Sequence, residues 1–591
     1  MKGTRLAFVR LVGAGLLALG GAALFRYGPQ VNVTFGPNAN TAPAATTLAV
    51  TAVAAKPQDA AASQANATVV AETAPTEAAP AAAAQTERLK PIWGPSYKEN
   101  DGLGRITCGA YAFSADYVLQ QIQIAGLDVK HGFHLGIVPF YLNENYVVTA
   151  KERTDALQNG TLDCLLTTFD LIALEDPGVL TTFINESAGG DQLWARNVAS
   201  LNDLKGKRIA FEADGPSEYF VQDLLATVQL TPKDVTLLPQ PNQGAAIETF
   251  NKEEADVVAG WTPVIFDAEK SGGQMLASSK EFRSILGGIV MSRQAMQSKR
   301  TVIQLFHDAW FEALAQQETD FGTAAKQIAQ WGNNDFLGVQ ADTAEDDLRT
   351  LLDGVAQANL ADNVRAFSNV SAIISRLLQA RNLWAAAGHP VPGGDVTAIV
   401  NPEFVQASAR SVQVDLNAPN KFVNNSFSLG RTLQPIQAST DVTTTVAATT
   451  AVTAAVAPAQ PDAITSARTV ATLPCSRFEF VPNSVQLQPA SQQELTSCAL
   501  RVLQQNVNLY VRIKGSSAWP GPKGAYKQAQ VEGTAKQRAD SIVAFLVAQG
   551  VARERFVVEW TLPPQDHWET TDLAKQAEDR YVEITLLASG L

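Results

Sequence analysis

Short apolar runs alternate with segments of helical periodicity through the middle of the chain. Residues 105–111 form an apolar run that predicts a β-strand, followed by a helix through Ile124 with Ser114 as its cap. Residues 201–211 predict a short helix, a stop at Gly206 and another strand. Because strands and helices alternate, this part of the chain is expected to form an α/β fold with mostly parallel sheets.

Two more strands are predicted on either side of a turn-rich crossover. The apolar runs are residues 181–184 and 193–196, and the crossover is 185–191. A helix is predicted over about 214–228, where Asp, Gly, Pro and Ser open the segment. After Ser292 apolar residues recur with helical spacing, so a long helical region is expected there.

Two segments in the middle of the chain share the same predicted order of structural elements. Residues 156–168 and 249–262 each run from a helix end through a turn into a short buried strand. Asp163 and Asp256 stand at the two strand entrances, and small polar or aromatic residues follow the strands. Ligands of open α/β sheets bind beyond the carboxyl ends of strands. The repeat therefore predicts two lobes that hold something in a cleft, with both Asp residues setting the turns.

Two stretches rich in Ala, Thr and Pro lie on either side of this predicted α/β part of the chain, which we call the large block. They predict flexible spacers, because they cannot bury enough apolar surface to offset chain entropy. The chain therefore divides into a signal-anchor or transmembrane helix, a disordered linker, a large two-lobed domain, a second linker and a C-terminal domain. Their predicted bounds are 1–28, 29–88, 89–432, 433–470 and 471–591.

The N-terminal segment has the charge pattern of a targeting sequence. Lys2, Arg5 and Arg10 accompany an apolar run, and residues 6–24 are nearly long enough to span a bilayer. We expect an uncleaved anchor, a single pass through a bacterial cell membrane and an extracytoplasmic location for the bulk of the chain. Cleavage at the small residues 21–23 is the alternative.

Charge and cysteine content narrow the classes of partner and compartment. The formal net charge of −13 argues against nucleic acid, which needs a basic surface. The four cysteines form two pairs, each within one predicted domain, and such an even number outside the cytosol favours disulfides. Four buried free thiols are the alternative, because large cores need no covalent staple. The cysteines are Cys108, Cys164, Cys475 and Cys498.

Patterns typical of enzymes are missing from the sequence. His131 and His134 have a spacing that a metal could use on a helix, but the glycines around them predict a turn or strand. The sequence contains no Cys-x-x-Cys, His-Glu-x-x-His or Gly-x-Ser-x-Gly pattern. We therefore predict no catalytic residue, no metal and no cofactor.

The large block resembles the solute-binding proteins of ABC transporters, most closely the nitrate, sulfonate and thiamine-precursor group. Residues 156–163, 201–210 and 254–261 carry this resemblance. It implies a type II periplasmic-binding fold whose two lobes close on a small molecule. The thiamine-precursor branch also contains pyrimidine synthases with a Cys-rich motif. The chain has no Cys cluster, so the resemblance implies binding rather than synthesis.

The resemblance places ligand-binding candidates at loop ends around the cleft. Simple packing or turn capping is the alternative for each of them. Asp170 and Asp214 favour a cationic or neutral ligand, since a cation can also lie over an aromatic ring. The candidates are Tyr111, Phe113, Thr167, Thr168, Asp170, Asp214, Ser217, Trp261 and Thr262.

The C-terminal block resembles the α+β OmpA-like domain that holds proteins to peptidoglycan. Residues 478–487, 511–515, 534–543 and 579–584 carry this resemblance. It implies that Arg538 and Ser517 bind peptidoglycan. The family's ligand-binding Asp is replaced by Ala518, so a retained fold with a lost or altered ligand is the alternative.

Together these patterns predict a membrane-tethered, extracytoplasmic solute-binding protein for ABC-type transport that carries a cell-envelope domain. The expected partners are a small solute, an ABC permease, peptidoglycan and the membrane. A cell-wall scaffold or a solute sensor without a transport role is the alternative, and an enzyme built on the binding fold is the least favoured.

Overall fold

The computed structural model describes residues 89–411 and 467–588, with gaps at 112, 144–145, 149, 263, 332–337, 476–477, 479 and 481–484. The predicted membrane helix, the first linker and most of the second linker lie outside these ranges. Within them, no helix combines the length and the apolar character needed to cross a bilayer.

The first lobe is built on a mixed seven-stranded sheet in the order β1-β3-β2-β6-β13-β7-β14. Strand β2 is parallel to β3 and β6, whereas β13 is antiparallel to both β6 and β7. Buried side chains such as Ile106 and Leu166 place the core against the helices. The strands are β1 (Ile92–Trp93), β2 (Gly104–Ala110), β3 (Phe133–Pro139), β6 (Cys164–Thr168), β7 (Val179–Ser187), β13 (Leu286–Met291) and β14 (Val355–Gln357).

Helices from both ends of the large domain cover this sheet, and the long helical region predicted after Ser292 supplies most of them. Strand β14 interrupts that region. The helices are α3 (Val118–Ile124), α4 (Leu127–His131), α5 (Ala150–Gln158), α6 (Phe169–Glu175), α9 (Arg293–Ser298), α10 (Arg300–Thr319), α11 (Phe321–Gln330), α13 (Ala344–Leu351), α14 (Leu360–Phe367), α15 (Val370–Ala387) and α16 (Glu403–Ser411).

The second lobe is a five-stranded sheet in the order β10-β9-β11-β8-β12. Strands β9, β10 and β11 are parallel neighbours, and β8 is antiparallel to β11 and β12. Its elements are β8 (Asp191–Ala195), β9 (Arg208–Glu212), α7 (Pro216–Thr227), β10 (Thr236–Gln240), α8 (Gln243–Asn251), β11 (Val257–Trp261) and β12 (Gln274–Ser278).

Three predictions for this domain are wrong in detail. Neither sheet is mostly parallel, because the strands through which the chain enters and leaves the second lobe run antiparallel to their neighbours. Strand β7 extends to Ser187 and takes up half of the turn expected at 185–191. The helix expected to be capped by Ser114 begins instead with a 3-10 turn over Ser114–Tyr117, whose N-cap residue is Phe113.

The C-terminal domain has a four-stranded sheet in the order β15-β18-β16-β17. Strand β15 begins at Arg468, before the predicted boundary at 471. Helix α21 packs so closely on β16 that a Cβ at Gly515 would meet Ala535 O at 2.2 Å. The elements are β15 (Arg468–Thr472), α19 (Pro489–Leu495), α20 (Arg501–Gln505), β16 (Tyr510–Ser516), α21 (Gln528–Ala548), β17 (Phe556–Thr561), α22 (Leu573–Glu578) and β18 (Val582–Ala588).

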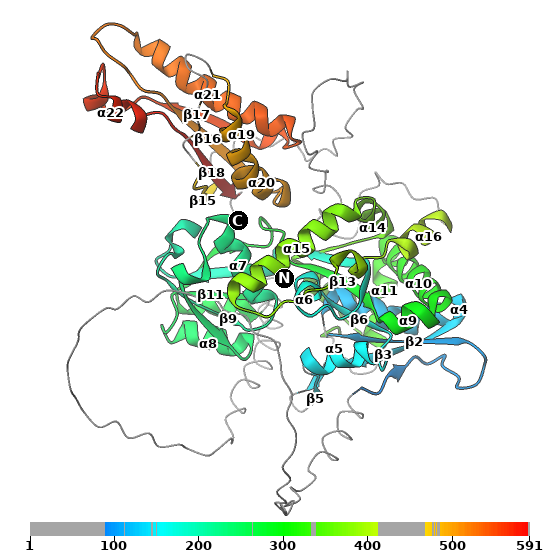
Figure 1. Cartoon of the computed structure of the whole chain (residues 1–591). Helices are drawn as coiled ribbons and strands as arrows, with labels where there is room; N and C mark the ends of the chain where they lie inside the picture. The colour runs from blue at the N-terminus through cyan, green and yellow to red at the C-terminus, as the bar shows by residue number, and fades with distance from the viewer. Residues whose placement is uncertain are drawn as a thin grey trace, which may run out of the picture.

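The C-terminal domain contacts the second lobe and the segment that leaves it (Figure 1). Arg283 N donates a hydrogen bond to Asn506 Oδ1 at 3.0 Å. Arg468 Nη1 donates to Leu276 O at 2.5 Å, and Thr472 N donates to Asn202 Oδ1 at 2.8 Å.

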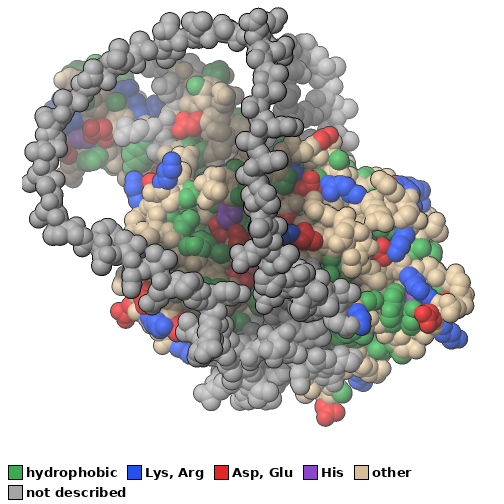
Figure 2. Space-filling view, turned by 60° about the horizontal axis from the view of Figure 1, so that its bottom comes forward, with side chains coloured by type: hydrophobic (Ala, Val, Ile, Leu, Met, Phe, Trp, Pro, Cys, Tyr) green, Lys and Arg blue, Asp and Glu red, His purple; other side chains and the backbone are tan. Residues whose placement is uncertain are grey.

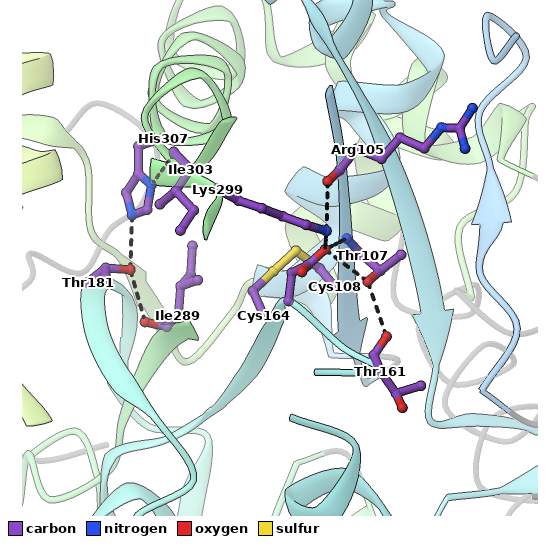
Figure 3. Close-up of a disulfide and its surroundings, with 11 residues drawn as sticks. Arg105, Thr107, Cys108, Thr161, Cys164, Thr181, Ile289, Lys299, Ile303 and His307 are labelled. Atoms are coloured by element: carbon purple, nitrogen blue, oxygen red, sulfur yellow. Dashed lines mark hydrogen bonds and ion pairs between the residues drawn. A yellow bond between two sulfur atoms is a disulfide. The ribbon is translucent and has the colours of Figure 1, made fainter. Parts of the chain in front are cut away.

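Two disulfides are present, so the structure favours disulfides over free thiols. Cys108 and Cys164 join the neighbouring strands β2 and β6, with their Cα atoms 4.5 Å apart (Figure 3). Cys475 and Cys498 are joined within the C-terminal domain, with Cα atoms 6.3 Å apart. Each pair lies inside one domain, so neither disulfide fixes the orientation of one domain against the other.

The two Asp residues of the sequence repeat hold backbone turns. Asp163 accepts hydrogen bonds from Thr107 N at 2.9 Å and from Lys299 Nζ at 2.8 Å beside the first disulfide. Asp256 accepts from Arg208 N and from its guanidinium, both at 2.9 Å. Both carboxylates are satisfied by the protein itself, as expected for structural residues.

Candidate functional site

Two chain crossovers form the hinge between the lobes. The first joins β7 to β8 and the second joins β12 to β13. Ser187 Oγ lies 2.7 Å from Ser279 Oγ, and Asp191 N donates to both hydroxyls, at 3.1 and 3.0 Å. Charged residues of the two lobes act on each other beside these crossovers, Arg153 with Glu212 and Glu175 with Asp214, so the cleft between the lobes lies here.

The first lobe contributes the end of β6 and the start of α6. Asp170 lies in the first turn of α6 and is 1% exposed. Trp384 Nε1 donates to its backbone oxygen at 2.9 Å and fixes this turn. Both carboxylate oxygens of Asp170 and Thr168 Oγ1 are buried without a hydrogen-bond partner among the described residues. We call such atoms orphan atoms.

The second lobe contributes the turn between β9 and α7. Asp214 adopts a left-handed conformation with φ of 55°, which lets the chain enter α7 at Pro216. Ser217 follows in the first turn; it is 2% exposed, and its Oγ is also an orphan atom. Orphan atoms therefore come from helix starts in both lobes.

A histidine from beyond α15 joins the two lobes at this turn. His389 Nδ1 lies 3.3 Å from Asp214 Oδ1, and its Nε2 lies 2.7 Å from Glu218 Oε1. These three side chains could also ligate a metal, since their ligand atoms lie within 4.8 Å of one another. However, each carboxylate lies against a different ring nitrogen, so contacts with the imidazole ring itself account for the arrangement.

An arginine from α5 lies against aromatic rings beside the cleft. Arg153 Cζ is 4.6 Å from the Tyr111 ring centroid and 5.6 Å from that of Phe140. The carboxylates of Glu175, in the first lobe, and Glu212, in the second, both act on its charge. The guanidinium thus already has a π-face and two nearby anions.

Burial raises the pKa of several carboxyl groups around the cleft. It raises the pKa of Asp170 to about 7, the nearby Thr168 side chain opposes this shift, and the charges of Asp191 and Glu175 add smaller increases. Burial also raises the pKa of Asp191 to about 6 and raises those of Glu175 and Glu212. On the face of the molecule drawn in Figure 2, acidic side chains and a histidine surround a hollow near the middle.

The remaining candidates lie at the ends of neighbouring strands. Trp261 is 37% exposed, pairs with Asp191 between β11 and β8, and accepts a hydrogen bond from Gln243 Nε2 at 2.6 Å. Thr262 N donates to Gly190 O at 2.9 Å, so its backbone belongs to the hinge. Thr167 pairs with Gly288 in the sheet, and Phe113 is exposed.

Sequence reasoning missed four residues of the cleft. Asp191 fell inside the expected turn, and His389 is distant in sequence from the residues it contacts. Arg153 and Glu175 carried no motif; only their position near the ends of predicted strands and helices could have drawn attention to them. The missed residues are Arg153, Glu175, Asp191 and His389.

A second group of orphan atoms lies at the end of β16 in the C-terminal domain. They are Arg538 Nε and Nη1, Ser516 Oγ, Trp519 Nε1 and Asp579 Oδ2. Ser516 N donates to Tyr581 O at 2.9 Å, which brings the β16 end beside the residues before β18. Ser517 is buried next to Ser516, but its Oγ is not an orphan atom, because it points to Ala518 O at 3.5 Å.

Neighbouring aromatic residues frame this second group. The Trp519 ring stacks on Trp568, with centroids 4.7 Å apart, and Arg538 Cζ lies 5.2 Å from the Phe480 ring. His567 Nδ1 lies 3.0 Å from Asp579 Oδ1, which leaves Oδ2 as the orphan atom. Burial and the charge of Arg580 lower the pKa of Arg538. The sequence analysis missed Asp579 as a candidate, since it read this residue only as the start of a strand.

The fold and these contacts define a two-lobed α/β protein with an acidic cleft between its lobes. Residues 182–325 match the model of the family described as NMT1/THI5 like. The match begins in β7, spans the whole second lobe and ends in α11. No curated protein matches the sequence.

Solved structures similar to about half of the chain include three binding proteins. The alkanesulfonate-binding protein SsuA from Xanthomonas axonopodis pv. citri, bound to MOPS, is 17% identical; the match covers 51% of this chain and 98% of that chain, with a TM-score of 0.38. The aliphatic sulphonate binding protein SsuA from Escherichia coli is 15% identical, with coverages of 50% and 92% and a TM-score of 0.40. The nitrate-binding protein NrtA from Synechocystis PCC 6803 is 12% identical, with coverages of 53% and 90% and a TM-score of 0.38.

Proposed function

We propose that the protein is an extracytoplasmic solute-binding protein whose lobes close on a small molecule for ABC-type transport. The hinge is formed by two hydrogen-bonded crossovers, an arrangement suited to opening and closing of the lobes. The match of residues 182–325 to the NMT1/THI5-like model also supports this proposal.

The observation that carries the proposal is the set of orphan atoms in the cleft. Asp170 and Thr168 come from the first lobe and Ser217 from the second, and their orphan atoms are buried. The charge of Asp170 acts on Tyr219 of α7, two residues beyond Ser217, so the two lobes approach each other here. Buried polar groups are nearly always hydrogen-bonded, so a site that leaves several without partners suits a ligand that completes them. Such a ligand would favour the closed arrangement, because it bonds to both lobes at once.

The test is ligand-dependent stabilisation of the full chain across a library of charged and neutral metabolites. A ligand that binds only the folded protein raises its unfolding free energy by about 2.7 kcal/mol at a hundredfold excess over Kd. Mass spectrometry of solute that co-purifies with the native protein provides an independent readout. If no solute shifts the unfolding midpoint and none co-purifies, the transport proposal fails.

For the C-terminal domain we propose association with peptidoglycan, as the OmpA-like resemblance implies. Arg538 supports this proposal, because its orphan guanidinium nitrogens suit a carboxylate. Asp579 Oδ2 offers an acceptor for a ligand ammonium, the role that the missing Asp at position 518 would have had. Ser516, rather than the predicted Ser517, has the orphan hydroxyl.

We also propose that the N-terminal segment tethers the protein to the bacterial cell membrane, on the basis of its charge and apolar pattern. Fractionation of cells that express the full chain tests this, with recovery in the membrane fraction as the expected result. A cell-wall scaffold or solute sensor without a transport role is the second candidate. Sedimentation with peptidoglycan combined with a cleft that binds no solute would favour the scaffold.

A further inference from the structure

We propose that the interlobe cleft takes a small organic cation bearing N–H donors, held by Asp170, Thr168 and Ser217. This inference rests on the proposed solute-binding function and names the chemical class of the solute. It departs from the anionic ligands, sulfonate and nitrate, that the names of the similar structures print.

The first argument is the chemistry of the orphan atoms. Asp170 contributes two carboxylate oxygens, and Thr168 and Ser217 contribute one hydroxyl oxygen each. An ionised carboxylate only accepts hydrogen bonds, and a hydroxyl can accept them. An ammonium or guanidinium group has several donors and a positive charge, so its chemistry matches oxygens of this kind.

The second argument is the charge that surrounds them. Asp191 and Glu175 act electrostatically on Asp170, and Glu175 and Glu212 act on Arg153. The nearby nitrogen groups are already engaged: Arg153 lies on Tyr111 beside two carboxylates, and the His389 ring contacts Asp214 and Glu218. An anionic solute would meet uncompensated carboxylates, which is unfavourable at short range.

The third argument concerns the helix starts, which ordinarily favour anions. Each of the two helices that begin at the cleft already has an acidic residue in its first turn, Asp170 in α6 and Glu218 in α7. Glu218 Oε2 also accepts a hydrogen bond from Asp214 N at 2.9 Å. An acidic residue therefore already stands at each helix start, which weakens the attraction of these helix starts for an anionic ligand.

The fourth argument separates an organic cation from Ca²⁺. The orphan set supplies four oxygens from three side chains, whereas Ca²⁺ takes six to eight oxygen ligands. The partly exposed Trp261 adds an aromatic face at the end of β11, and such faces stabilise organic ammonium groups.

The experiment compares probes of opposite charge and similar size on the full chain. Putrescine, agmatine and ethylammonium are tested against succinate and ethanesulfonate at millimolar concentration, with thermal unfolding as the readout. We expect at least one of the three amines to raise the unfolding midpoint of the large domain by several degrees, whereas neither anion does.

The Asp170→Asn variant tests the residue that carries the inference. It keeps the shape of the side chain but removes the charge, so we expect about 10- to 100-fold weaker amine binding, as for loss of a charged hydrogen bond. Asp540→Asn is the matched control, because Asp540 is paired with Lys536 on the surface of α21. Should Asp170→Asn unfold, Ser217→Ala provides a second measurement in the same site.

The outcomes distinguish failure of the cation inference from failure of the proposed solute-binding function. Stabilisation by succinate or ethanesulfonate but by none of the amines overturns the cation inference and leaves solute binding intact. Amine binding that survives Asp170→Asn and Ser217→Ala also overturns it, since the ligand would then lie elsewhere. If no amine stabilises the protein the inference fails, and if no metabolite of the wider library does so either, the solute-binding function fails with it.

Discussion

The interlobe cleft and the end of β16 both contain buried orphan atoms, but of opposite chemistry. In the cleft the orphan atoms are oxygens of Asp170, Thr168 and Ser217, all of which can accept hydrogen bonds. At the end of β16 they are mostly nitrogen donors of Arg538 and Trp519, with oxygens on Asp579 and Ser516. The comparison teaches that one chain can carry two buried groups of polar atoms with different chemistry, and we propose a cation for the first and a group containing a carboxylate for the second.

The largest expected effect is on the pH dependence of stability, and it distinguishes the two sites. The folded-state pKa values of Asp170 and Asp191 are about 7 and about 6, above their ordinary value of 3.8. Between about pH 4 and pH 7 the folded, unliganded protein therefore binds more protons than the unfolded chain. The stability from these protonated groups is fully present below about pH 4 and is lost as the pH rises to 7.

Each pKa unit corresponds to roughly 1.4 kcal/mol, so these two groups together change the unfolding free energy by several kcal/mol. Buried His307 acts in the opposite direction, because its pKa is lowered to about 4. Comparison of the wild type with Asp170→Asn by calorimetry isolates the cleft. We expect a flatter pH profile for the large domain and an unchanged profile for the C-terminal domain. Identical profiles for wild type and variant would contradict the assignment of a raised pKa to Asp170.

The next largest effect concerns the second site. Replacement of Arg538 by Ala should weaken sedimentation of the full chain with purified peptidoglycan by about 10- to 100-fold, as expected for loss of a charged hydrogen bond. Lys536→Ala is the matched control, because Lys536 lies two positions earlier on α21 and is exposed. The amine response of the cleft should be the same in both variants. Retention by the Arg538 variant at the wild-type level would mean that the domain has kept its fold without this ligand.

In the third prediction, a substitution beside the binding site strengthens ligand binding instead of weakening it. Arg153→Gln removes a positive charge beside the cleft, so an organic cation should bind roughly tenfold more tightly if the effective dielectric constant is near 20. A solute that carried a negative charge would instead bind more weakly. Isothermal titration with the amine that stabilises the wild type measures the sign directly. Tighter amine binding sharpens the contrast between the two sites, whereas weaker binding would show that Arg153 holds the ligand.

Local patterns in the sequence were sufficient to predict much of the fold. An apolar run predicts the strand over 208–212. Gly206, whose φ is positive, ends the short helix before it, and a proline marks the start of α7. The mixed direction of the sheets could not be predicted in this way. It depends on which distant strand lies next to β13 and β8, and pairing between distant strands has no local signature.

The cleft was predictable only in part, for a related reason. Asp170 and Ser217 were identified because each follows a predicted strand end, where ligands of α/β proteins bind. Arg153 and His389 could not be identified, because their significance arises from contacts with Glu212 and Glu218 in the other lobe. Asp579 was missed because the family pattern directed attention to the lost Asp at position 518. Only the folded chain shows that another carboxylate has an orphan oxygen nearby.

The smallest expected effect tests whether the second lobe takes part in binding. Ser217→Ala removes one neutral hydrogen bond, so amine affinity should fall by about 2- to 10-fold. The stability of the unliganded protein should hold or rise slightly, because the orphan Oγ no longer lies buried without a partner. Ser298→Ala is the control, since Ser298 is exposed and its Oγ donates to Gln294 O within α9. Unchanged amine affinity in the Ser217 variant would confine binding to the first lobe, and closure of the lobes would then no longer explain how the solute is held.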